Sequence, residues 1–142
     1  MIVFTAVDDT NGMLFNKRRQ SQDSVLREHM LTLCGENPLF VTPYTAKQFS
    51  AEQQARLRIE ENPLEAAAKG DFCFIETLPL MPYAEKIEKV CLYKWNRRYP
   101  ADFFFDLPLS APAWKLEETE EFAGTSHDTI TKEVFIHETS EA

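Results

Sequence analysis

The stretch Ile2-Val3-Phe4-Thr5-Ala6-Val7, followed by Asp8-Asp9-Thr10-Asn11-Gly12, decides the fold of this chain. Six consecutive residues that favour β-structure and are nearly all apolar predict a strand that is buried on both faces. The acids, threonine, asparagine and glycine that follow are typical of a turn. We therefore expect residues 2–7 to form a central strand of a sheet, and residues 13–22 to continue as a long polar loop.

Helix and strand signals alternate beyond this loop. Apolar residues at helical spacing predict a helix from Asp23 to Cys34, with Ser21 or Asp23 as its N-cap and Gly35 at its end. Apolar runs bounded by turn residues predict further strands, and alternating residues near the end of the chain predict a hairpin. The expected strands are residues 39–41, 72–75 and 90–95, and the two arms of the hairpin are residues 114–122 and 130–137.

The middle of the chain is predicted to be helical. A helical turn is expected over residues 44–49, and Ser50 with Gln53 fits a capping box that opens a helix to about Glu61. Asn62-Pro63 fits the start of another helix, which Gly70 would close. Strands that alternate with helices indicate an α/β domain with a mixed sheet, and the length of 142 residues favours a single domain over residues 1–142.

The net charge of −8 argues against nucleic acid or an anionic membrane as a partner. The chain has no apolar run long enough to span a membrane and no signal-peptide pattern. Three cysteines cannot all pair within one chain, and two of them lie in apolar runs. Buried free thiols and a cytoplasmic location are therefore expected.

Several stretches resemble the dihydrofolate reductase family in order and spacing. The first strand and its turn resemble the start of that fold, and Asp23 stands where the family places its single buried acidic residue. Thr45 is the residue that remains of a Gly-Arg-x-Thr motif. The resemblance implies a central mixed sheet flanked by helices and ended by an antiparallel hairpin. The matching stretches are Val7–Met13, Phe40–Thr45, Leu64–Ala68, Phe72–Ile75, Ile87–Trp95, Ala101–Asp106 and Trp114–Leu116.

The departures from the family fall on its cofactor site. The glycine pair that lets the backbone approach the cofactor pyrophosphate is Glu76-Thr77 here, and the phosphate-binding arginine is Pro43. The segment between Phe49 and Asp71 is shorter than in the family and shows no strand-like run, so we expect one strand to be missing. The loop ahead of Asp23 is charged instead of apolar. We therefore expect no cofactor and no NADPH-dependent reductase activity.

Asp23 is the main candidate for a ligand-binding residue, because a carboxylate in a cleft can bind a heterocycle; the alternative is a helix-start acid that interacts with the helix dipole. Arg27 lies one helical turn further on. Guanidinium groups near Asp23 suit an anion, but they can equally be solvated or paired. Tyr44 and Thr45 stand either at a ligand site or in a simple strand-to-helix turn. The candidate residues are Asp23, Arg27, Thr45, Tyr44, Arg18 and Arg19.

The three histidines, His29, His127 and His137, show no metal-binding spacing, so no metal site is expected. No Ser–His–Asp or Cys–His arrangement can be identified from spacing either. Two functions therefore stay open. The chain binds a small anionic or heterocyclic ligand near Asp23, or it is a non-catalytic interaction module, such as a homodimer, that keeps only the scaffold.

Overall fold

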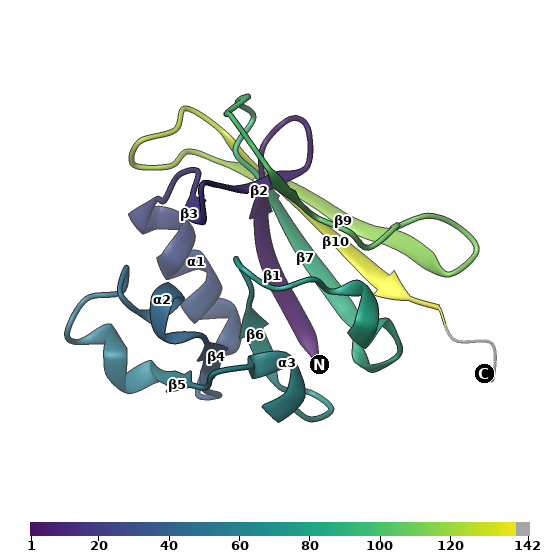
Figure 1. Ribbon diagram of the computed structural model, residues 1–142, viewed down its shortest axis with the longest axis horizontal. Helices are drawn as coiled ribbons and strands as arrows, with labels where there is room; N and C mark the ends of the chain where they lie inside the picture. The colour runs from purple at the N-terminus through teal and green to yellow at the C-terminus, as the bar shows by residue number, and fades with distance from the viewer. Residues whose placement is uncertain (139–142) are drawn as a thin grey trace.

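The computed structural model describes residues 1–138 and has one large twisted sheet, whose strands lie in the order β5-β4-β6-β1-β7-β10-β9 (Figure 1). Strands β2, β3 and β8 form a second, small sheet. The strands are β1 Ile2–Val7, β2 Gly12–Phe15, β3 Arg18–Arg19, β4 Leu39–Val41, β5 Leu57–Ile59, β6 Phe72–Phe74, β7 Lys89–Lys94, β8 Phe103–Phe104, β9 Trp114–Phe122 and β10 Ile130–His137. The helices are α1 Ser24–Cys34, α2 Pro43–Ala46 and α3 Pro63–Ala66, with two 3₁₀ segments, Gln53–Arg56 and Met81–Lys86.

The position of β1 confirms that the first strand is central. It pairs in parallel with β6 on one side and with β7 on the other. Strand β10 is antiparallel to both β7 and β9, so the sheet is mixed and ends in the expected hairpin. The predicted α/β class is confirmed by this arrangement.

Each face of the sheet carries its own core, because neighbouring residues of a strand point to opposite faces. Val3 and Val7 of β1 belong to a core that includes Leu64, Leu80 and Trp114. Phe4 belongs to the other core, which α1 covers with residues at helical spacing. The buried residues of α1 are Leu26, Met30, Leu31 and Cys34. This packing fixes the start of α1 beside the end of β1, where the candidate site lies.

The prediction of a long polar loop over residues 13–22 is wrong. Strand β2 pairs with β3 through Leu14 and Arg19, and β8 pairs with the other side of β2. The turn between β2 and β3 is made by Asn16 and Lys17, both with positive φ angles, 52° and 64°. A two-residue turn of this kind usually contains glycine, so its usual sequence signal is lacking.

The predicted helix from Ser50 to Glu61 is also wrong, although its capping box forms. The Gln53 amide donates to Ser50 Oγ at 3.2 Å, and the Ser50 amide donates to Gln53 Oε1 at 3.0 Å. Only a 3₁₀ turn follows, because Leu57–Ile59 leaves helical geometry and pairs in parallel with β4 as an edge strand. A strand therefore stands where we expected one to be missing.

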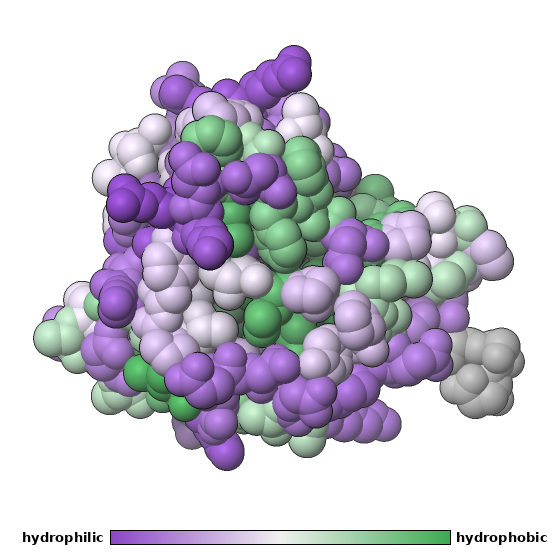
Figure 2. Space-filling model, in the orientation of Figure 1, coloured by the Kyte–Doolittle hydropathy of each residue, from purple (hydrophilic) through white to green (hydrophobic). Residues whose placement is uncertain are grey.

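The predicted free thiols are confirmed, since Cys34, Cys73 and Cys91 are all buried and unpaired. Burial raises the pKa of the Cys34 and Cys73 thiols to about 12, so neither is a thiolate near neutral pH. Between residues 1 and 138, no helix is both long enough and apolar enough to cross a membrane. On the face shown in Figure 2, hydrophobic residues gather near the centre and hydrophilic residues surround them.

Candidate functional site

Asp23 is the N-cap of α1, and its carboxylate is buried, with 2% of the residue exposed. Its extended backbone (φ −153°, ψ 129°) turns the carboxylate toward the first amides of the helix. Asp23 Oδ1 accepts hydrogen bonds from the amides of Val25, at 2.9 Å, and Leu26, at 3.4 Å. These bonds satisfy amides that have no partner within the helix.

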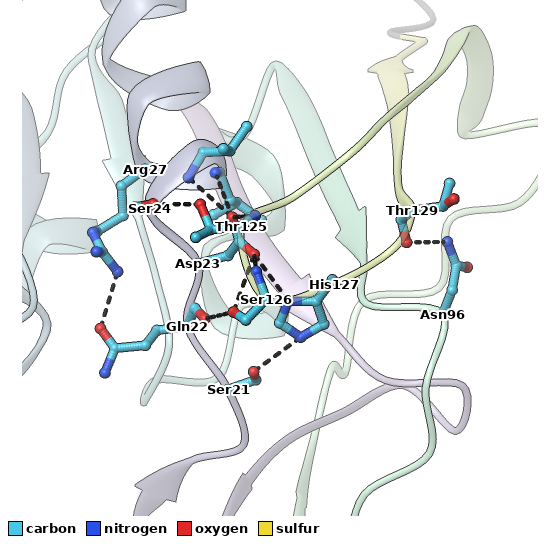
Figure 3. A network of polar contacts seen from close by, with 12 residues as sticks. Ser21, Gln22, Asp23, Ser24, Arg27, Asn96, Thr125, Ser126, His127 and Thr129 are labelled. Carbon is cyan, nitrogen blue, oxygen red and sulfur yellow. Dashed lines mark hydrogen bonds and ion pairs between the residues drawn. The ribbon is translucent and has the colours of Figure 1, made fainter.

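The same carboxylate holds the loop between β9 and β10, about one hundred residues further along the chain. The Thr125 amide donates to Oδ1 at 3.0 Å and the Ser126 amide donates to Oδ2 at 2.9 Å (Figure 3). Gly124 makes this approach possible, because a Cβ atom there would lie 2.5 Å from Asp23 Oδ2. Asp23 therefore joins the start of α1 to the hairpin loop.

His127 extends this contact toward the surface. Its Nδ1 lies 3.0 Å from Asp23 Oδ2, and its Nε2 lies 3.0 Å from Ser21 Oγ and 3.2 Å from the Tyr99 hydroxyl. The ring is 4% exposed and stacks on Trp95, with 4.5 Å between centroids. Figure 3 shows the His127 ring between Ser21 and Asp23, with a contact from the ring to each of them.

The hydrogen bonds keep Asp23 ionised. Burial opposes ionisation, but the bonds donated by Thr125, His127 and Ser126 outweigh it and hold the pKa of the carboxyl well below its ordinary value of 3.8. An ionised carboxylate only accepts hydrogen bonds, so His127 Nδ1 must carry the proton that it shares with Asp23. In the neutral ring, Nε2 is then the acceptor that faces the Ser21 and Tyr99 hydroxyls.

Arg19, Tyr44 and Thr45 meet at a second cluster, around Glu76. Arg19 forms a two-pronged pair with the Glu76 carboxylate, at 2.9 and 3.1 Å, and its guanidinium lies 4.3 Å from the centroid of the Tyr44 ring. Thr45 Oγ1 and Gln48 Nε2 donate to Glu76 Oε1, at 2.9 and 3.2 Å. Only about 10% of the Glu76 side chain is exposed. The candidates Arg19, Tyr44 and Thr45 thus surround an internal anion.

Arg27 does not form an ion pair with Asp23. Its guanidinium donates to Gln22 Oε1 at 2.9 Å. The side chain lies along a groove of about 400 Å³ between α1 and the segment after α2. The groove is lined by Ser24, Val25, Arg27, Glu28, Gln48, Phe49, Ser50 and Gln53.

Arg18 lies at a different pocket, of about 500 Å³, beside the Asp23–His127 contact. Its lining residues are Phe15, Asn16, Arg18, Arg19, Gln20, Tyr99 and Pro100. Two of its lining residues connect it to the Asp23–His127 contact, because Tyr99 contacts His127 and Gln20 directly precedes Ser21. Arg18 forms no ion pair within residues 1–138, in contrast to Arg19. We call this cavity the Arg18 pocket.

Sequence reasoning missed the role of Ser21, Tyr99 and His127. Asp23 and His127 are 104 positions apart, and only the fold brings them together. The sequence shows Glu76 as a departure from the family's glycine, but it does not reveal the partners of this carboxylate. In the part of the chain that the structure describes, no three His, Cys, Asp or Glu side chains cluster as a metal site would require.

Acidification is expected to destabilise the protein through Asp23. A carboxyl with a depressed pKa stabilises the folded state above its unfolded pKa, and this contribution is lost as pH falls below about 3.8. The free energy of unfolding should therefore fall more steeply below pH 4 in the parent than in Asp23→Asn. Urea titrations between pH 2.5 and 7 measure this, and equal slopes for the two proteins would contradict it.

No protein-family model matches the sequence, and no curated protein matches it. Among solved structures, the chain is similar to dihydrofolate reductase from Enterococcus faecalis complexed with NADP(H) and RAB-propyl. The TM-score is 0.66 at 10% sequence identity, and the match covers 98% of this chain and 97% of the reductase. At this identity the match shows the fold alone. The protein therefore has a dihydrofolate reductase-like α/β fold.

Proposed function

We propose that the protein binds a small anionic ligand in the Arg18 pocket and does not reduce dihydrofolate with NADPH. The Arg18 pocket is the observation that carries this proposal. A volume of about 500 Å³ suits a small molecule, and Arg18 supplies a cation without an ion-pair partner in residues 1–138. Gln20 and Tyr99 add polar groups to the wall, as small-ligand sites require.

The Glu76 cluster supports the absence of NADPH chemistry. Thr45 is the one residue that matches the family's phosphate-binding motif, and here it donates to the Glu76 carboxylate at 2.9 Å. Arg19 and Gln48 donate to the same carboxylate. These donors would suit a phosphate, but an internal anion already uses them and would repel a second one.

The Asp23 carboxylate supports the same conclusion. In the resembled family this acid is available to a heterocycle. Here its oxygens accept four backbone amides, the Ser126 hydroxyl and His127. No lone pair is left for a pterin, so Asp23 acts by positioning the loop at residues 124–127 rather than by direct contact with that kind of ligand. We also place the protein in a reducing cytoplasm, because its three cysteines are unpaired.

Two measurements test the proposed function. Mixing the protein with NADPH and dihydrofolate should give no absorbance change above background. Glutarate, a small dicarboxylate, should raise the melting temperature, because a ligand that binds the folded state stabilises it by RT ln(1 + [L]/Kd). Arg18→Gln should abolish that shift, while Arg58→Gln, on the distant strand β5, should keep it. Reductase turnover, or a shift that survives Arg18→Gln, contradicts the proposal.

A second function, a homodimeric module, has its own support in the sheet edges. Strand β5 is an edge strand, and its Ile59 is 49% exposed. Unpaired edges invite a second strand, and hydrophobic residues also gather near the centre of the face in Figure 2. The molar mass from light scattering tests this alternative. A dimer formed through β5 should have twice the mass of the chain, and Ile59→Lys should reduce it to the mass of the monomer.

A further inference from the structure

We propose that Ser21, His127 and Asp23 are the nucleophile, general base and orienting acid of a hydrolase that cleaves esters of small anionic acids. The inference rests on the proposed function, because the Arg18 pocket would hold the acid part of the ester. It adds a reaction to a site that otherwise only binds.

The three side chains have the order and spacing that nucleophilic catalysis needs. Ser21 Oγ lies 3.0 Å from His127 Nε2, and His127 Nδ1 lies 3.0 Å from Asp23 Oδ2. Both contacts are within the reach that proton transfer requires. Because the ionised Asp23 fixes the proton on Nδ1, the lone pair of Nε2 is aimed at the serine. A buried acid thus holds the histidine in the tautomer of a general base.

Ser21 is partly exposed and directly follows Gln20, a residue of the Arg18 pocket wall, although Ser21 itself does not line that pocket. Ser21 is half-buried in the segment between β3 and α1, whereas His127 and Asp23 are buried behind it. Gln20, the preceding residue, lines the Arg18 pocket, and so does Tyr99. The proposal requires that a carboxylate bound at Arg18 leave the ester carbonyl of the same molecule within reach of Ser21, three positions further along the chain.

An oxyanion donor is available next to the nucleophile. The Gln22 amide has no hydrogen-bond acceptor within residues 1–138. The amide of the residue after a nucleophilic serine is a common oxyanion donor in hydrolases. The Tyr99 hydroxyl can be a second donor, because once Nε2 carries a proton it no longer accepts from Tyr99.

The reaction balances without any other reactant than water. Ser21 Oγ attacks the ester carbonyl carbon, its proton passes to His127 Nε2, and the carbonyl electrons move onto oxygen. The bond from carbon to the alkoxy oxygen then breaks, and the alcohol leaves with the proton from Nε2. Water hydrolyses the acyl-serine by the same route, so Ser21 is regenerated and a carboxylic acid is released.

A purely structural role explains less of this geometry. Asp23 accepts four amides without the help of His127, so capping α1 and holding the loop do not need an imidazole. The ring is nevertheless buried against Trp95, with its free nitrogen directed at two hydroxyls near a pocket. Helix capping by Asp23 does not explain why the Ser21 hydroxyl lies at His127 Nε2.

A fluorophosphonate probe tests the nucleophile, since Ser21 Oγ would displace fluoride and form a stable phosphonyl ester. Mass spectrometry of the full chain should find one adduct, on Ser21, and Ser21→Ala should remove it. This variant should fold normally, because the Ser21 hydroxyl makes a single hydrogen bond. Ser24→Ala, a matched change at the exposed start of α1, should keep the adduct. His127→Gln should also lose it.

Hydrolysis of mono-4-nitrophenyl glutarate tests the substrate class. Ser21→Ala should lower kcat/KM about a thousandfold. Arg18→Gln should lower it about tenfold for this ester, while Arg58→Gln, on the distant strand β5, should leave it within about twofold. Glutarate binding without any adduct or hydrolysis would overturn the triad and leave the proposed function standing. An adduct on Ser21 without glutarate binding would contradict the proposed function and retain the triad.

Discussion

Asp23→Ala is expected to lower the free energy of unfolding by about 3–5 kcal/mol. The change removes an N-cap, and it leaves the Thr125 and Ser126 amides and His127 without the acceptor that they share. Buried donors that lose their acceptor are destabilising, more so when that acceptor is charged. Urea unfolding followed by circular dichroism measures the loss.

Asp9→Ala is the matched control, because Asp9 is an exposed acid near the end of β1. Its effect should stay within about 0.5 kcal/mol. If Asp23→Ala lost less than about 1 kcal/mol, the carboxylate would not be the group that joins α1 to the loop before β10. The structural basis of the proposed triad would then fail, since the triad depends on a fixed His127.

The sequence predicts those strands whose own residues carry a clear hydrophobic pattern. Ile2–Val7 is nearly all apolar, and the second arm of the terminal hairpin, Ile130–His137, alternates clearly, so the sequence predicts the bounds of the first strand and of the hairpin correctly. Leu57–Ile59 is different. Three residues beside a capping box suggest a helix, and only the exposed edge of β4 makes them a strand. Tertiary pairing outweighs local preference in such short segments.

The residues of the candidate site also differ in whether the sequence alone can predict their role. Asp23 stands out in the sequence because the resemblance puts the family's single buried acid at this position, and a helix start also favours an acid there. The sequence cannot reveal that His127 is the partner, because hairpin loops carry polar residues for many reasons. The sequence allows Ser21 as the N-cap of α1, but its hydroxyl contacts His127 Nε2 instead, at 3.0 Å. The fold brings the loop between β9 and β10 to the start of α1, and this creates the contacts of His127 with Ser21 and Asp23. Spacing along the chain gives no sign of them.

Glu76→Ala is expected to lower the free energy of unfolding by about 2–4 kcal/mol. Three donors converge on this carboxylate, from Arg19, Thr45 and Gln48, and the Arg19 side chain is only 16% exposed. Removing the anion leaves a largely buried guanidinium without its counter-charge. The same change creates a vacant set of anion donors, so sulfate should bind the variant and restore part of the stability.

Glu60→Ala provides the comparison, because Glu60 pairs with Arg58 at the same 2.9 Å but on the surface of the sheet edge, where Arg58 is 57% exposed. Exposed ion pairs contribute about 0–1 kcal/mol, so the free energy of unfolding of this variant should stay close to that of the parent. Sulfate should not raise it. For Glu76→Ala, sulfate at ten times its Kd should return about 1.4 kcal/mol, and the parent should gain none of it. Equal responses of the parent and Glu76→Ala would mean that Glu76 does not occupy an anion site. The internal carboxylate would then not be the reason to expect no NADPH binding.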